Sequence, residues 1–168
     1  MTFEELQAKI GKQNPADWHQ HKNGLGWVSN AADVDESCYV AGIVWALYGK
    51  PKVCGNARVY GDARVYGDAR VYGDAQVYGN AQVYGDAQVH GCAWVYGSAW
   101  EKSPLFLLDS RGHGATNCKH GWLKIGCEEH TFAEWKERFP AIARKHNLND
   151  AEKAEYLAII ELFCKIGK

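Results

Sequence analysis

A six-residue unit repeats from Val53 to Trp100, and it constrains the fold more than any other feature of the chain. The eight units read VCGNAR, VYGDAR, VYGDAR, VYGDAQ, VYGNAQ, VYGDAQ, VHGCAW and VYGSAW. Val suits a pleated strand, whereas Gly followed by Asp or Asn is typical of a turn. Each unit is therefore predicted to be a short strand and a corner, with Val and Ala facing inward. A period this short predicts a β-solenoid.

The pattern V-x-G-[ND]-A-x resembles the hexapeptide motif of left-handed β-helices, in which three units close one triangular coil. This resemblance implies left-handed winding and 18-residue coils. The same phase extends upstream in steps of six through Val28, Val34, Val40 and Ala46, with Val44 at the fifth place of its unit. The next step, to Val53, is seven residues, which predicts one extra residue at a corner near residues 48–51. The fold class is thus predicted to be mainly β, with about four coils.

Coils of 18 residues place side chains above one another in outward columns. The predicted columns are Arg58-Gln76-Trp94, Arg64-Gln82-Trp100 and Tyr60-Tyr78-Tyr96. Such columns allow ring stacking and cation–π contact between successive coils.

The segments on either side of the repeat carry signals for helices and short strands. Capping-box patterns at residues 2–5 and 131–134 and a third helix start at 149–152 predict helices over 3–10, from 131 with an interruption near Pro140, and from 149 to about 166. Apolar stretches predict strands over 104–108 and 121–125, separated by a polar segment over 110–120. The predicted organisation is an N-terminal helix and linker (1–26), a left-handed β-helix (27–101), a short β segment (102–130) and a C-terminal helical cap (131–168).

The composition excludes several classes of function. Nineteen Lys and Arg residues against 20 Asp and Glu give a net charge of -1, which disfavours bulk nucleic-acid binding. The apolar runs are too short to cross a bilayer, and residues 1–11 lack a signal-peptide pattern, so no membrane association is expected. Six cysteines without a framework spacing favour a reducing, cytoplasmic location.

A second resemblance covers the ends of the chain. The stretch from Trp122 to Trp135 resembles the tail motif of hexapeptide-repeat proteins of phages and prophages, and the stretch from His21 to Val28 is similar to the same family. The resemblance implies a phage-type protein in the cytoplasm of a host cell, without a defined activity. Left-handed β-helix proteins commonly assemble as trimers, so a homotrimer is also implied.

The outward columns form a candidate ligand-binding surface. Its candidate residues are Arg58, Arg64, Arg70, Tyr60, Tyr66, Tyr72 and Tyr78. Aromatic faces and guanidinium groups together suit nucleobases, phosphates or acidic partners. The alternative is structural, because tyrosines and arginines on neighbouring strands stabilise one another by stacking.

His90 is the single histidine of the repeat and the candidate base of an acyltransferase. Acyltransferases of this fold resemble one another in placing a histidine in a cleft between subunits, often under a loop that leaves the coil. The one-residue interruption predicted here is too short for such a loop. The alternative is a surface histidine that replaces a tyrosine.

Metal-ligand residue types are dense between residues 113 and 130. The candidates are Cys118, His120, Cys127 and His130, accompanied by His113. Cys127-x-x-His130 has a plausible local spacing, but Cys118-x-His120 is not a common zinc-finger arrangement. A packing role is therefore favoured, no cofactor is expected, and a closed structural zinc site is the alternative.

These observations favour a non-enzymatic phage-type binding protein that interferes with a host process. Its partner would be a host protein, or a small anionic ligand such as a nucleotide that it sequesters. The alternatives are a structural virion or scaffold protein and a hexapeptide-repeat acyltransferase.

Overall fold

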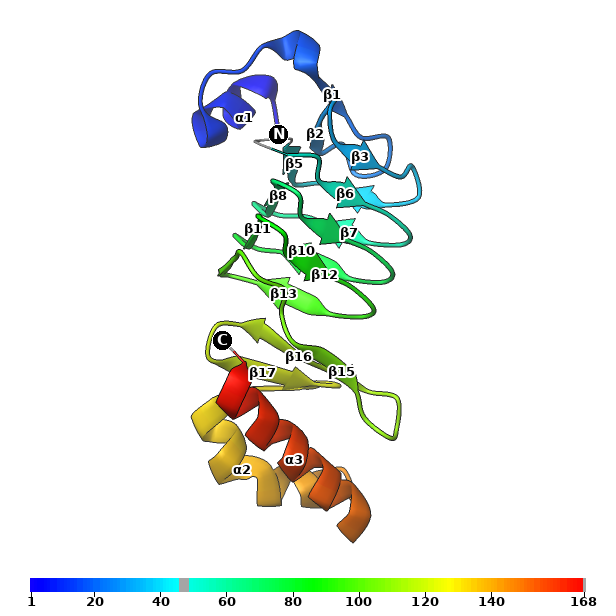
Figure 1. Cartoon of the computed structure of the whole chain (residues 1–168), viewed down its shortest axis with the longest axis vertical. Helices are drawn as coiled ribbons and strands as arrows, with labels where there is room; N and C mark the ends of the chain where they lie inside the picture. Colours follow the sequence, from blue (N-terminus) through cyan, green and yellow to red (C-terminus); the bar gives the residue numbers. More distant parts are fainter. Residues whose placement is uncertain (46–48, 168) are drawn as a thin grey trace. The chain divides into compact units, whose positions relative to one another are not determined.

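The computed structural model describes residues 1–45 and 49–167, and the chain divides into two compact units (Figure 1). The solenoid unit comprises Met1–Ser103, and the C-terminal unit comprises Pro104–Lys168.

The solenoid unit winds through three sheets for about four turns, which confirms the predicted fold class. Sheet A contains, in order, β1 (Trp18–Gln20), β2 (Trp27–Ser29), β5 (Ile43–Trp45), β8 (Arg64–Tyr66), β11 (Gln82–Val83) and β14 (Ala99–Trp100). Sheet B contains β3 (Asp33–Val34), β6 (Lys52–Val53), β9 (Arg70–Val71) and β12 (Gln88–Val89). Sheet C contains β4 (Tyr39–Val40), β7 (Arg58–Val59), β10 (Gln76–Tyr78) and β13 (Trp94–Tyr96). All pairings are parallel except that of β1 with β2.

The inward positions of the repeat form the core of the solenoid unit. Every Val and Ala of the first and fifth places from Val53 to Val95 is completely buried. The corner glycines allow the coils to approach closely. Gly67 has a φ of 70°, and a Cβ there would lie 2.9 Å from the backbone nitrogen of Gly85. The repeat thus specifies both the apolar interior and the tight corners around it.

The first coils depart from the predicted phase. Val44 pairs with both Val28 and Val65 and is completely buried, so it holds the first place of its unit instead of the fifth. The predicted first-place residue, Ala46, lies outside the described residues. The step from Val40 to Val44 is four positions and the step from Val44 to Val53 is nine, instead of the predicted steps of six and seven. One short step and one long step thus replace the single predicted insertion. Burial of the apolar Val44 side chain favours this register.

Two of the three predicted columns are confirmed. Arg58, Gln76 and Trp94 are aligned on sheet C, as are Tyr60, Tyr78 and Tyr96.

The third predicted column, Arg64-Gln82-Trp100, is wrong at its last member. Gln82 pairs with Ala99, while Trp100 pairs with Val83 and is 3% exposed. The last coil is one residue short at this point, and the shift places the large indole inside, where its burial is favourable.

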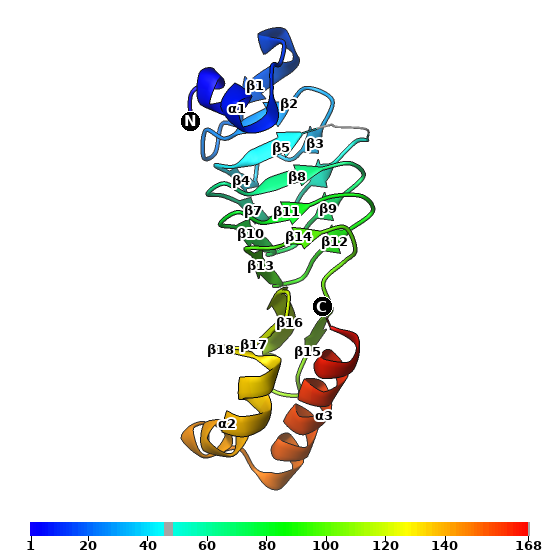
Figure 2. The same cartoon turned by 90° about the vertical axis from the view of Figure 1, so that its left-hand side faces the viewer.

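The N-terminal segment covers part of sheet A (Figure 2). Helix α1 (Phe3–Ile10) begins with the predicted capping box at Thr2. Its Leu6 packs with Trp18 of β1 and Ile43 of β5, so the helix lies on the outer face of the sheet. After the 3-10 helix η1 (Pro15–Asp17), β1 pairs antiparallel with β2 and covers the exposed edge of the sheet.

The loop after β1 covers the edge of sheet C in a similar way. Gly26 N donates to Val40 O at 2.7 Å, and Val40 N donates to Asn23 O at 2.9 Å. His21 is buried, and its Nε2 donates to Asp35 O at 3.1 Å. The motif from His21 to Val28 therefore has a structural role at the start of the solenoid.

The C-terminal unit combines antiparallel sheet D with two helices. The sheet contains β15 (Phe106–Leu108), β16 (Gly114–Lys119), β17 (Trp122–Ile125) and β18 (Glu128–Thr131) in sequence order, and the helices are α2 (Phe132–Lys145) and α3 (Asp150–Ile166). Trp135 of α2 and Phe163 of α3 are completely buried in its core. Among the described residues, none of the helices combines the length and apolar character needed to cross a membrane.

Two predictions for this unit were wrong. The polar segment expected to separate the two strands itself contains strand β16, whose residues Ala115 to Cys118 are buried. Helix α2 continues through Pro140 instead of breaking there. Pro140 is exposed, so water can satisfy the backbone carbonyl that loses its helical partner.

Candidate functional site

The predicted ligand-binding residues lie on three different walls of the solenoid unit. Arg58, Tyr60 and Tyr78 belong to the wall of sheet C, Arg64 and Tyr66 to that of sheet A, and Arg70 and Tyr72 to that of sheet B. The fold therefore distributes these seven side chains instead of gathering them in one site.

The tyrosines are engaged with one another and with glutamines of the next turn. Tyr60 stacks on Tyr78 with ring centroids 5.2 Å apart, and its hydroxyl donates to Gln76 Oε1 at 3.1 Å. Tyr66 donates to Gln82 Oε1 at the same distance. Burial raises the pKa of both Tyr60 and Tyr66. These tyrosine columns brace successive turns, as the structural alternative expected.

His90 continues one of these columns. Its ring stacks on Tyr72 with centroids 5.3 Å apart and an interplanar angle of 19°. The candidate base thus takes the place and the packing of the tyrosine that it replaces.

A polar hollow, the corner groove, follows the edge between sheets B and C. It has a volume of about 610 Å³. Its lining residues are Asn23, Ser37, Tyr39, Asn56, Arg58, Asp74 and Gln76. Arg58 and Tyr39 are exposed, and Asn56 Nδ2 donates to Asp74 Oδ1 at 3.2 Å. The groove therefore offers a guanidinium, an aromatic ring, several amides and one carboxylate.

Sequence reasoning flagged Arg58 in the corner groove but missed the other lining residues. Most of them come from the linker, from the irregular early coils and from corner positions, while Gln76 begins β10 beside Arg58 in a predicted column. Asn56 and Asp74 occupy the same place in units that are one turn apart, which is the signal that could have paired them.

The predicted metal-ligating residues are placed apart in the C-terminal unit. Cys118 is buried on β16, His120 is exposed in the turn that follows, Cys127 is exposed in the β17–β18 turn, and His130 is half-buried on β18. Among the described residues, the group with converging ligand atoms includes Cys127 but none of the other three.

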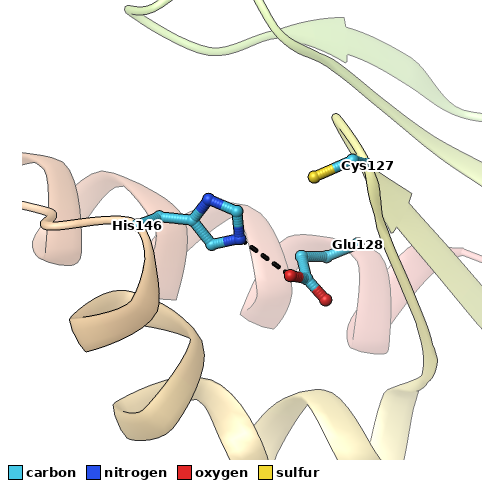
Figure 3. Close-up of side chains that lie close together, drawn as sticks. All are labelled: Cys127, Glu128 and His146. Carbon is cyan, nitrogen blue, oxygen red and sulfur yellow. Dashed lines mark hydrogen bonds and ion pairs between the residues drawn. The ribbon is translucent and has the colours of Figure 1, made fainter.

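That group, the C-terminal cluster, consists of Cys127, Glu128 and His146 (Figure 3). One ligand atom from each residue lies within 4.8 Å of the others. His146 is the C-cap residue of α2, and the other two follow β17. Glu128 and His146 were missed because they are 18 residues apart and neither is a ligand position in the Cys127-x-x-His130 spacing.

Glu128 is the centre of the charges in the C-terminal cluster. Its Oε1 accepts from His146 Nε2 at 2.7 Å and from Lys145 Nζ at 2.6 Å, while its Oε2 lies 3.2 Å from His130 Nε2. These hydrogen bonds, led by that from His146, lower the pKa of Glu128 to about 2. The carboxylate is therefore ionised at neutral pH.

A small cavity adjoins the C-terminal cluster. It has a volume of about 60 Å³. Its walls are His113, Ile125, Gly126, Cys127, Glu128, Ile142, His146, Leu148 and Tyr156. His113 and Tyr156 belong to a separate network, in which buried Asp109 lies 3.1 Å from His113 Nδ1. Burial, together with the hydrogen bond to Asp109, raises the pKa of Tyr156. This network fixes the β15–β16 loop against α3.

Comparison with known protein families identifies the repeat but not the rest of the chain. The YdcK beta solenoid repeat matches over residues 52–65, 63–75 and 75–91. No curated protein matches the chain, and neither does any solved structure. The chain thus carries a YdcK-type β-solenoid repeat, which agrees with the fold and assigns no chemistry.

Proposed function

We propose that this protein is a non-enzymatic binding protein that holds a small anionic ligand of the nucleotide class in its corner groove. The observation that supports the proposal is the convergence of Arg58, Tyr39 and five other polar side chains on one hollow of about 610 Å³. This volume lies within the range of about 300–1,000 Å³ that is common for small-molecule sites. A largely polar lining suits a polar anion better than an apolar ligand.

Each part of the groove has a counterpart in a nucleotide. The guanidinium of Arg58 can bind a phosphate through two parallel hydrogen bonds. The exposed ring of Tyr39 offers a stacking face for a base, and it is held edge-on against Tyr60 at 6.5 Å. The amide of Asn56 and the carboxylate of Asp74 supply a donor and acceptors for base edges or ribose hydroxyls.

The solenoid favours binding without rearrangement. Tyr60 and Gln76, which lie next to Arg58 on the wall of sheet C, are hydrogen-bonded to each other across one turn. Side chains that are already ordered lose little entropy when a ligand binds.

The proposal extends to assembly and biological role through the resemblance to phage-type hexapeptide-repeat proteins. It comprises left-handed winding, a homotrimer, and interference with a process of the host by sequestering the ligand in the cytoplasm. The alternative of a host-protein partner places the exposed residues of sheets B and C in an interface. Helix α1 occupies part of the outer face of sheet A, which leaves the other two walls for assembly.

One observation favours a second candidate, a purely structural role. The tyrosine columns are satisfied by stacking and by Tyr–Gln hydrogen bonds within the chain, so they need no ligand. The acyltransferase alternative depends on His90, whose ring is stacked on Tyr72.

Binding is tested by titrating the full chain with adenosine monophosphate, adenosine diphosphate and inorganic phosphate in a calorimeter. Arg58→Ala is expected to weaken nucleotide binding at least tenfold, because a charge-assisted bidentate contact contributes about 1.5–3 kcal/mol. Arg70→Ala is the matched control, since Arg70 is also exposed and also precedes a buried Val but does not line the groove.

An equal loss of nucleotide affinity in Arg58→Ala and Arg70→Ala would contradict a binding site in the corner groove. No binding by any of the three probes, together with copurification in particles or filaments, would support the structural role instead. Native mass spectrometry of the same preparations measures the number of subunits independently of the ligand.

A further inference from the structure

We infer that Cys127, Glu128 and His146 form a binding site for a divalent transition-metal ion of the zinc type. The three residues offer a thiolate, a carboxylate and an imidazole, which are the ligands that zinc takes in proteins. Their ligand atoms lie within 4.8 Å of one another without any rearrangement of the backbone (Figure 3). The site is independent of the corner groove and of the nucleotide proposal.

The cavity beside the C-terminal cluster leaves space for the ion and for a further ligand. Its volume of about 60 Å³ exceeds the 10–15 Å³ that one water molecule requires. Ile125, Ile142 and Leu148 form apolar walls, which strengthen the interaction between an ion and its ligands. Three protein ligands with an open fourth position correspond to an exchangeable site and not to a closed structural one.

The surroundings favour a cation and orient the ligands. His146 lies at the C-terminus of α2, a helix of 14 residues, where the helix dipole is negative. His130 Nε2 lies 3.2 Å from the second oxygen of Glu128 and holds the carboxylate in place. Residues that hydrogen-bond to a metal ligand and orient it in this way are a regular feature of metal sites. The ring of His130 is fixed in turn by an edge-to-face contact with Trp135 at 5.3 Å.

Lys145 would compete with a metal ion for the carboxylate of Glu128. Its ammonium group donates to the same Glu128 oxygen as His146, at 2.6 Å. The side chain of Lys145 is 67% exposed, so it can turn into solvent when an ion arrives. If the cluster binds a metal ion, removing Lys145 should strengthen metal binding, whereas removing a ligand residue should weaken it.

The experiment uses the full chain after treatment with a chelator, titrated with Zn²⁺ in a calorimeter and with Co²⁺ in a spectrophotometer. One ion per chain is expected, and Co²⁺ should show the charge-transfer absorption of a thiolate ligand. Cys127→Ser should abolish that absorption and weaken Zn²⁺ binding more than the 10–100-fold typical of losing an outer partner. Lys145→Gln should strengthen Zn²⁺ binding severalfold.

Cys92→Ser provides the matched control, because Cys92 is another exposed cysteine and lies in the solenoid unit. It should leave the stoichiometry, affinity and Co²⁺ absorption unchanged. Cys127 is itself exposed, so serine there is not expected to unfold the chain, and far-UV circular dichroism verifies this. Absence of binding, binding that is unaffected by Cys127→Ser, or weaker binding in Lys145→Gln would each overturn the site.

Discussion

The solenoid unit and the C-terminal unit achieve a buried core by opposite means. In the solenoid unit, one small set of contacts is repeated, so that Val71 and Val77 have nearly the same surroundings and both are completely buried. In the C-terminal unit each core residue is used once. Trp135, for example, fills the centre and donates its indole N–H to Leu123 O at 2.6 Å. Repetition spreads stability over many equal positions, whereas a single-use core concentrates it in a few.

The same difference affects where polar chemistry can arise. Side chains in the solenoid columns meet copies of themselves, as in the Tyr60-Tyr78-Tyr96 stack. The C-terminal unit brings unlike groups together from distant segments, such as Glu128 and His146 or Asp109 and Tyr156. A repeat therefore builds extended surfaces, and an irregular core builds local clusters.

The largest expected effect tests the concentration of stability in Trp135. Trp135→Ala should destabilise the C-terminal unit by about 3–5 kcal/mol, because it leaves a large cavity and removes the hydrogen bond that the indole donates to the Leu123 carbonyl. Hydrogen exchange followed by mass spectrometry should show lost protection in peptides of α2, α3 and sheet D. Peptides of the repeat between Val53 and Val95 should keep theirs. Equal loss of protection in both units would contradict the comparison.

An intermediate effect is expected from two glycines that both have positive φ. Gly67→Ala in the solenoid should cost about 2–3 kcal/mol, because a left-handed alanine is strained and its Cβ would meet the next coil at 2.9 Å. Gly121→Ala in the β16–β17 turn should cost only about 1–2 kcal/mol, since a Cβ there has no neighbour within 4 Å. Urea denaturation of both variants measures the difference, and equal costs would show that coil contact does not limit the corner.

The smallest expected effect concerns the pH dependence of the C-terminal unit. Burial raises the pKa of Asp109, but hydrogen bonds from the His113 backbone, from Tyr156 and from the His113 ring outweigh it, and the pKa is lowered below 3.8. The contribution of the Asp109 carboxylate to the stability of the C-terminal unit is therefore fully present above pH 3.8. It is lost as the pH falls through the lowered pKa of Asp109.

Asp109→Asn should remove about 1–2 kcal/mol at pH 7 and flatten the acid side of the stability profile. Urea midpoints of the helical circular dichroism signal, measured from pH 7 to pH 3 for both proteins, provide the check. If the urea midpoint of the Asp109→Asn variant fell with pH as steeply as that of the original protein, other carboxylates would control the acid destabilisation.

Predictions from the sequence succeeded where structure depends on neighbouring residues. The regular units gave the β-solenoid, and the capping box at Thr2 gave the start of α1, because strand, corner and cap are local properties. They failed where packing overrides the local pattern, as at Val44 and Trp100, which are buried inside the solenoid although the repeat phase did not place them at a first position. Helix α2 likewise continues through Pro140 because that residue faces solvent.

Residue type alone singled out Cys127 and His130, and it singled out Arg58 on the solenoid. It offered no reason to join Cys127 with His146, which is 19 residues further along the chain. Nor did it offer a reason to join Arg58 with Tyr39 and Asp74, which are 19 residues before it and 16 residues after it.

The sequence by itself determined the coil, its inward valines and alanines, and its glycine corners, since a six-residue period fixes each residue's environment by its place in the unit. Only the tertiary structure decided the first register shift, the inward turn of Trp100, and the meeting of Cys127, Glu128 and His146. The physical reason is that these features depend on contacts between segments far apart in the chain. Such contacts are selected by the packing of the whole unit and not by any local pattern.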